Sequence, residues 1–298
     1  MKPSPIALAS ILVLASISPA AAQVGQDGTD NSFMAAIGRQ ASVDFSYEPD
    51  TDLDAGGSFS YWDARISAPV YGTKLSDDWT LGVRMRYRAS VFDWNQQVLF
   101  DNDTLHRVDL NLAFIYKPEN SPWMGFLSAG PALATDGSNI DGDDIFFVAL
   151  AGVGYKISET FTLLGGAYFS QDFGEPRLLP APGFLWTPND HWTFSLIPPR
   201  LRIAYSPNRN WRFAAEAFPD GGRWSITTQN GQDAFLDRSG ARAGLRVERR
   251  VFGNGWLYLG GGLMFGRELE VETTGGANLF RSDADTGAWF GTGFAWQF

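Results

Sequence analysis

Arginine at alternate positions is the feature of this sequence with the clearest chemical potential. Arg84, Arg86 and Arg88 stand two residues apart between apolar neighbours, and Arg200 and Arg202 repeat the spacing. In an extended strand such residues share one face. Guanidinium groups that line a confined aqueous pore attract anions and disfavour cations. We therefore predict a passive channel that prefers anionic or acidic solutes.

The same alternation assigns eleven arginines and six carboxylates to one face of the predicted strands. They are Asp44, Glu48, Asp63, Arg65, Arg84, Arg86, Arg88, Arg107, Asp109, Arg200, Arg202, Arg212, Glu216, Arg242, Arg246, Glu248 and Arg250. In a structural alternative these groups pair across neighbouring strands, with Asp63, Asp109 and Glu248 as the natural partners, and stiffen the wall without promoting flux. The excess of arginine over acid keeps the channel hypothesis open beside it.

Three of the predicted strands turn apolar side chains toward the same interior. These are Met124, Phe126, Phe146, Val148, Leu150, Leu257, Leu259, Leu263 and Phe265. Leucine and phenylalanine do not favour a wet lumen, so something must cover them. The candidates are an infolded loop, for which the Pro-rich segment 178–188 is suited, the N-terminal tail 23–39, or an amphipathic solute with its acidic head on arginine.

Other chemistry is weakly supported. His106 and His191 are the only histidines, and His191 stands near Thr193 and Ser195 without a clear orienting carboxylate, so a lipid hydrolase is the least favoured function. Five oxygen-bearing side chains between 136 and 144 do not match a calcium-loop spacing, and we interpret them as a solvated acidic loop. We therefore predict no enzyme, no cofactor and no metal.

The elements that must position these residues are β-strands. Period-two alternation recurs over segments of about 9–16 residues, and no long helical pattern appears after the N-terminus. Short polar turns alternate with longer, acidic connections, which is the asymmetry of outer-membrane barrels. The fold class predicted is an all-β, antiparallel transmembrane barrel.

Aromatic residues flank the short turns, as in the girdle that marks a membrane interface. The predicted girdle is Tyr71, Trp79, Tyr116, Trp123, Tyr155, Phe161, Tyr205, Trp211, Trp256 and Phe298. The spacing of these turns predicts twelve strands, near 40–48, 58–72, 79–93, 104–117, 123–135, 145–157, 160–172, 192–206, 211–227, 237–252, 256–270 and 286–298. Ten or fourteen strands are alternatives, because Pro198–Pro199 and Pro219 interrupt two of these runs.

The composition limits the class of protein further. Residues 1–22 show a basic start, an apolar core and a small-residue cleavage pattern, which predicts a secretory signal peptide. Residues 23–39 then form a periplasmic tail or plug, and residues 40–298 form the barrel. The mean hydropathy of −0.14 excludes a helical polytopic membrane protein, and the net charge of −10 gives no electrostatic footprint for nucleic acid. The absence of cysteine excludes a disulfide framework.

Two stretches resemble known barrels. Phe294, Trp296 and Phe298 share one face of the last strand, which resembles the assembly signal of bacterial outer-membrane barrels. Gly130–Pro131, the stretch 135–137, and the runs 179–186 and 198–205 are similar to an uncharacterised outer-membrane barrel family. The resemblance implies a Gram-negative outer membrane, contact with its lipid and lipopolysaccharide, and insertion by the barrel-assembly machinery. It implies no solute. A plugged barrel with a structural or surface-binding role is the alternative function.

Overall fold

The structure, a computed structural model, describes residues 40–95, 103–138, 140, 142–172 and 176–298. The predicted signal peptide and N-terminal tail lie outside the described residues. The described elements are β1 (Gln40–Asp52), β2 (Ser58–Lys74), β3 (Trp79–Asn95), β4 (Thr104–Tyr116), β5 (Trp123–Thr135), η1 (Gly142–Asp144), β6 (Ile145–Ser158), β7 (Phe161–Ser170), β8 (Arg177–Pro180), β9 (Gly183–Asn189), β10 (Trp192–Ile197), β11 (Arg200–Asn208), β12 (Trp211–Pro219), β13 (Gly222–Thr227), β14 (Asp233–Phe252), β15 (Gly255–Thr273), β16 (Asn278–Ala284) and β17 (Gly287–Gln297). No helix among them is long and apolar enough to cross a bilayer.

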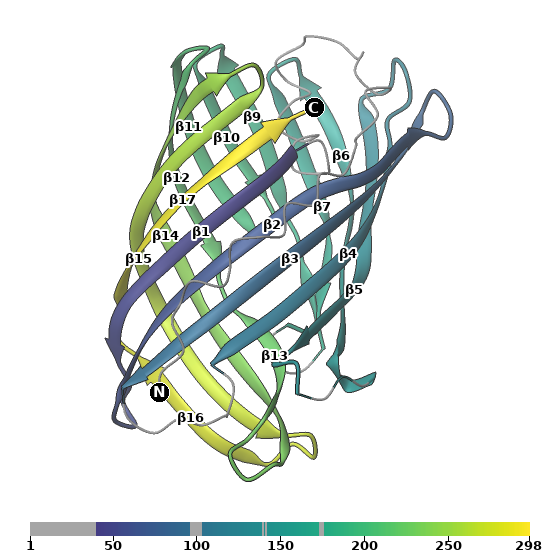
Figure 1. Ribbon diagram of the computed structural model, residues 1–298. Coiled ribbons are helices and arrows are strands. Elements are labelled where there is room, and N and C mark those ends of the chain that lie inside the picture. The colour runs from purple at the N-terminus through teal and green to yellow at the C-terminus, as the bar shows by residue number, and fades with distance from the viewer. Residues whose placement is uncertain (1–39, 96–102, 139, 141, 173–175) are drawn as a thin grey trace.

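The strands close into an antiparallel barrel (Figure 1). Fourteen strands form the ring, in the order β1, β2, β3, β4, β5, β6, β7, β9, β10, β11, β12, β14, β15, β17, and β1 closes it by pairing with β17. Closure satisfies the backbone hydrogen bonds of every wall strand, so the ring has no free edge. The predicted all-β barrel class is confirmed.

The ring has fourteen strands, which was the upper alternative to the twelve predicted, because a turn at two prolines separates two strands and the segment before them contains another. The segment 192–206 is two strands, β10 and β11, joined at Pro198–Pro199. The segment 171–190, predicted as a long loop, contains β8 and β9, which pair with the two halves of β7. The Pro-rich run 178–188 therefore builds the wall and does not fold into the lumen. The segment 211–227 is also interrupted, at the Asp220–Gly221 step between β12 and β13.

The two ends of the barrel differ. At the turn end, where the short connections lie, strands are joined by tight turns such as 253–254 and 209–210. At the opposite, loop end, β14 and β15 run past the ring and bind β13 and β16, which gives a four-stranded extension (Figure 1). The sheet bends where these strands reach Gly221, Gly240 and Gly266, and Gly266 adopts a φ of +58°, which favours glycine.

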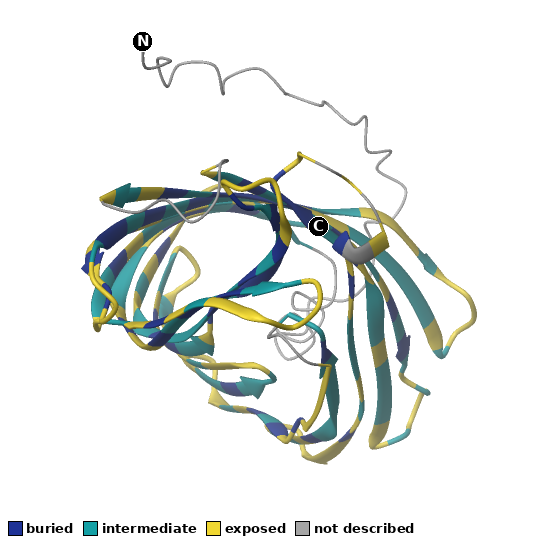
Figure 2. Cartoon of the chain, turned by 90° about the horizontal axis from the view of Figure 1, so that it is seen from below, coloured by how far each residue is buried: buried dark blue, intermediate teal, exposed yellow. Residues whose placement is uncertain are grey.

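The extension crosses the mouth and docks on the far wall. Ser225 of β13 pairs with Thr135 of β5, and the carboxylate of Asp136 accepts the backbone N–H of Thr227 at 2.8 Å. Viewed from this end, the extension curves over one side of the mouth (Figure 2). The barrel is therefore closed by its own strands on the β1–β5 side.

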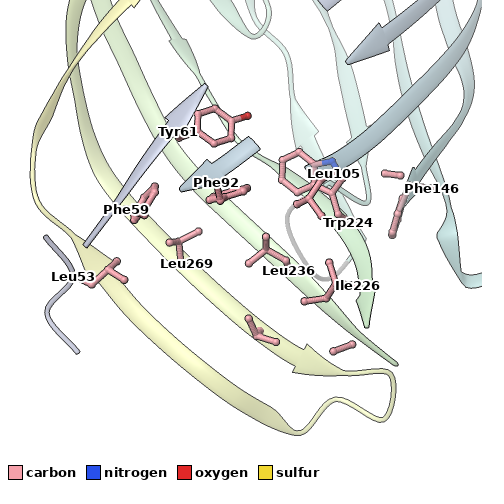
Figure 3. Close-up of a cluster of buried hydrophobic side chains, with 13 residues drawn as sticks. Leu53, Phe59, Tyr61, Phe92, Leu105, Phe146, Trp224, Ile226, Leu236 and Leu269 are labelled. Atoms are coloured by element: carbon pink, nitrogen blue, oxygen red, sulfur yellow. The ribbon is translucent and has the colours of Figure 1, made fainter. Parts of the chain in front are cut away.

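A hydrophobic core fills the space beneath the extension. Trp224, Leu236 and Leu269 of the extension pack with Phe59 and Phe92 of the wall, and all five are at most 1% exposed (Figure 3). Burial of each such side chain contributes about 1.5–3 kcal/mol. Lifting the extension would expose thirteen core residues at once, so this closure is a fixed part of the fold and not a gate.

Candidate functional site: a one-sided lumen

The strand register brings the predicted arginines to the interior of the barrel. Arg86 of β3 stands opposite Asp109 of β4, and Arg246 of β14 stands opposite Ala214 of β12. Because cross-strand partners share a face, the alternation carries one polar face around the ring. All the predicted lumen charges are on this face. Arg250 is the last of them at the turn end, where it bonds to the backbone carbonyl of Gly253 and to the side chain of Asn254.

Beneath the hydrophobic core lies a buried charged layer. The carboxylate of Glu48 accepts hydrogen bonds from Arg238 at 2.5 Å, Arg242 at 2.6 Å and Arg267 at 2.9 Å. Asp220 pairs with Arg238 at 2.7 Å and with Arg242 at 3.1 Å. These groups are at most 5% exposed. These buried groups therefore neutralise one another's charges.

The charged layer and the hydrophobic core are joined by stacked rings. The guanidinium of Arg238 lies 4.2 Å from the ring centre of Tyr61, and that of Arg267 lies 5.3 Å from the ring centre of Phe59. Such contacts let a cation border an apolar core without losing all stabilisation of its charge. The core and the layer together seal the half of the lumen between β1–β3 and β12–β17 at its loop end.

Two bridges mark the boundary of this sealed half. Arg65 of β2 reaches across the lumen to Asp220, at 3.5 Å, and also bonds to Asp63 at 2.7 Å. Arg88 of β3 donates to the carbonyl of Gly221 at 3.0 Å and pairs with Asp63 at 2.9 Å. We call this pair of contacts the partition. It divides the sealed half from the half bounded by β3–β11.

Two further ion-pair groups line the wall outside the partition. Glu248 pairs with Arg202, Arg212 and Arg246 at 2.6, 3.0 and 2.9 Å, while Glu216 lies 3.3 Å from Arg202 and 3.8 Å from Arg246. On the opposite wall Asp109 pairs with Arg86 at 3.1 Å and with Arg107 at 2.9 Å, and Asp172 binds Arg107 at 2.7 Å. The structural interpretation of these arginines, as partners of carboxylates, thus describes much of the lumen.

A few arginines remain open to solvent inside the barrel. The side chain of Arg86 is 52% exposed and that of Arg200 is 44% exposed, against 3% for Arg238. Arg84 bonds to Ser67 and to the carbonyl of Gln40, and it makes no ion pair within the described part of the chain. The most exposed of the ion-paired lumen arginines in the described chain, Arg86 and Arg200, therefore lie on the β3–β11 side.

The inner wall formed by β5 and β6 is apolar, as predicted. The prediction of apolar side chains inside the lumen on β15 is wrong. Phe126, Val148 and Leu150 point inward and are half-buried, while Phe146 joins the hydrophobic core and Met124 packs near Gly154. The placement of Leu257, Leu259, Leu263 and Phe265 in the lumen is wrong. Cross-strand pairing of Tyr258 with Glu248 and of Met264 with Arg242 puts these four on the outer surface, where each is at least 45% exposed.

The aromatic residues of the turn end meet in cross-strand pairs on the outside. Trp79 stacks with Tyr116 at a centroid distance of 4.8 Å, and Trp123 contacts Tyr155 at 4.7 Å. Tyr205 pairs with Trp192, which begins the predicted strand 192–206 and was not included in the predicted girdle. Tyr71 and Phe298 are exposed, and Phe161 and Trp211 are half-buried on the outer face.

One girdle prediction is wrong. Trp256 pairs with Ala295, which is buried, and its ring lies 4.7 Å from the guanidinium of the lumen residue Arg212. A bulge between Arg250 and Phe252 shifts the alternation by one residue and turns Trp256 inward.

The remaining candidates do not assemble a reactive site. The predicted solvated acidic loop is partly wrong, because Asp136 and Asp144 are at most 2% exposed. Nδ1 of His191 bonds to the carbonyl of Ser206, while the hydroxyl of Ser195 faces the carbonyl of Arg202. Within the described residues no three His, Asp or Glu side chains are arranged to hold a metal.

Sequence reasoning missed four charged residues of the lumen. Arg238 and Arg267 lie beyond bulges that shift the alternation, Asp220 was placed in a loop, and Asp172 lies at the end of β7. Three residues in the sequence could have indicated these positions. Pro219, Gly221 and Gly266 mark bends after which the alternation of inward and outward residues shifts.

Comparison with known proteins places the chain in a family. Residues 43–297 match the family described as a domain of unknown function, DUF6268. The chain belongs to this family. The match covers the ring strands apart from residues 40–42 of β1, and it agrees with the predicted resemblance to a barrel family without an established solute. No curated protein matches the sequence.

Solved structures that are similar to this chain are outer-membrane proteins with low sequence identity to it. An outer-membrane channel from Pseudomonas putida F1 is 11% identical, with 88% of this chain and 96% of that chain covered and a TM-score of 0.46. A Pseudomonas aeruginosa FadL homologue is 10% identical, with 87% and 90% covered and a TM-score of 0.42. The Pseudomonas putida toluene transporter TodX is 12% identical, with 88% and 90% covered and a TM-score of 0.38.

Proposed function

We propose that this protein is a passive diffusion channel of the bacterial outer membrane, and that small acidic amphipathic solutes pass along the β3–β11 side of its lumen. One observation carries the proposal. Arg86 and Arg200 point into the barrel and keep 52% and 44% of their side-chain surface exposed, whereas the charged layer beneath the core is sealed. Inward-facing exposed surface of this kind supports a solvated interior on this side of the barrel.

The outer surface supports a place in a membrane. Large apolar side chains such as Leu245, Leu259 and Phe290 point outward from the wall and are 57–68% exposed. Exposed apolar surface on this scale is unfavourable in water and suits a lipid environment. The paired aromatics of the turn end would then lie at the periplasmic interface, with the extension outside and the outer-leaflet lipopolysaccharide around it.

The two walls of the path explain the class of solute. Arg84, Arg86 and Arg200 supply accessible positive charge, and Phe126 and Leu150 line the wall between β3 and β11 with apolar surface. A molecule with an acidic head and an apolar body satisfies both walls, while a small cation gains nothing from either.

Conductance of the refolded protein in planar bilayers under a salt gradient tests this function. We expect steps that favour anions, and Arg84→Glu with Arg86→Glu should weaken or reverse that preference. The matched control is Arg281→Gln, because Arg281 lies on the outer face of β16 and is 61% exposed. Anion preference unchanged by the charge reversal would contradict the role of these arginines.

A closed barrel with a structural or surface-binding role is the second candidate. The hydrophobic core that seals the β1–β5 side of the mouth favours it. Its signature is the absence of conductance from protein whose folding is shown by heat-modifiable gel mobility.

A further inference from the structure

Arg200 occupies an unusual position at the loop end of the path. It begins β11 directly after the β10–β11 turn, so it is one of the first lumen residues that a solute from outside meets. Its guanidinium stacks on the ring of Phe218 at 4.4 Å, which fixes its plane. It makes no hydrogen bond to any described residue, and its nearest carboxylate oxygen, on Glu216, lies at 3.6 Å.

Glu216 cannot neutralise this guanidinium alone. Arg202 and Arg246 lie at 3.3 Å and 3.8 Å from the same carboxylate. Arg202 and Arg246 also bind Glu248, which Arg212 shares. Four arginines therefore share two carboxylates in this group, and Arg200, the most exposed of the four, carries the least compensated charge.

We propose that Arg200 forms a binding site for the carboxylate of a monoanionic amphipathic solute. The inference rests on the proposed function and names its first binding step. A guanidinium with its edge free matches the two oxygens of a carboxylate in bidentate geometry. Phe218 and the neighbouring Ile197, which pairs with Arg200, then supply apolar surface for the adjoining chain.

The charge count favours a monoanion. Arg202 and Arg246 already share Glu216 and Glu248, so Arg200 is the guanidinium of this group that is left to neutralise a full charge. A phosphate monoester, with its second charge, would need another unpaired cation that the described part of the site does not offer.

Equilibrium binding of octanoate to the detergent-solubilised full barrel, measured by titration calorimetry, tests the site. We expect Arg200→Gln to weaken octanoate binding by about tenfold or more, since a charged hydrogen-bonded pair is lost. Arg200→Lys keeps the charge but not the bidentate edge, and we expect an intermediate loss. Arg281→Gln is the matched control and should bind as the wild type does.

Two further probes separate the parts of the site. Octanamide has the same apolar chain without the charge, and we expect it to bind at least tenfold more weakly than octanoate. Octyl phosphate should not exceed octanoate in affinity. Equal binding of octanoate by the wild type and Arg200→Gln, with both folded by gel mobility, overturns the proposal. So does equal binding of octanamide and octanoate.

Failure of this inference and failure of the channel function give different results. If the wild type conducts anions while Arg200→Gln binds octanoate normally, the channel stands and the site falls. If octanoate binds through Arg200 while the wild type conducts nothing, the site stands and the proposed transport falls.

Discussion

Glu48 holds together the buried charged layer, and its neutralisation should strongly destabilise the barrel. The side chain is 1% exposed, and its carboxylate accepts hydrogen bonds from Arg238, Arg242 and Arg267. Glu48→Gln keeps the shape, removes the charge and points an amide N–H₂ at a guanidinium. Arg267 then retains only Thr51 and the carbonyl of Asp285 as hydrogen-bond partners among the described residues.

The magnitude follows from the number of charges left uncompensated. Removing one partner of a buried ion pair costs about 3–5 kcal/mol. Asp220 continues to pair with Arg238 and Arg242, so the loss centres on Arg267 and is not three times that value. We therefore expect a decrease of about 3–5 kcal/mol in the free energy of unfolding, which is more than a hundredfold in the folding equilibrium.

Urea titration of the protein folded in phospholipid vesicles, followed by tryptophan fluorescence and gel mobility, measures this loss. The control is Glu159→Gln, since Glu159 is 91% exposed and pairs only with Lys156 at a turn, where a salt bridge contributes about 0–1 kcal/mol. If the free energy of unfolding of Glu48→Gln fell by less than about 1 kcal/mol, the assignment of this layer as a mutually dependent network would be refuted.

Two further substitutions probe packing. Trp224→Ala empties the centre of the hydrophobic core and should lower the free energy of unfolding by about 3–5 kcal/mol in the same titration. The control, Leu279→Ala on β16, where Leu279 is 48% exposed, should change it by less than about 0.5 kcal/mol. Comparable losses for the two variants would show that the core does not hold the extension. Gly262→Ala would place a methyl group 2.0 Å from the carbonyl oxygen of Ala243 and should destabilise by about 1–3 kcal/mol, while Gly82→Ala, with nothing within 4 Å, serves as its control. A stable Gly262→Ala barrel would mean that β14 and β15 can separate freely.

The regular part of the wall could be predicted from the sequence alone. Along β3, β4 and β12 the alternation holds without interruption, so the inward position of Arg86, Asp109 and Glu216 followed from parity. The partnership of Asp109 with Arg86 also followed, because their positions face each other in adjacent strands.

The alternation assigned residues to the wrong face wherever a bulge or a bend lay between them and the regular part of the strand. Trp256 and Leu259 were each assigned to the wrong face because the bulge near Arg250 shifts β15 by one residue relative to β14. A one-residue slip reverses every side chain that follows, so a single irregularity misplaced a whole strand. Pro198–Pro199 had a different effect, since a turn interpreted as an interruption merged two strands, β10 and β11, into one.

The sequence by itself determined a closed antiparallel β-barrel with a polar interior, because alternation and turn chemistry are local properties of the chain. Only the tertiary structure decided which half of that interior is open. The contacts that divide it, Arg65 with Asp220 and Ser225 with Thr135, join residues 155 and 90 positions apart across the lumen. Such pairings depend on ring closure and on the bend of the extension, so no local pattern encodes them.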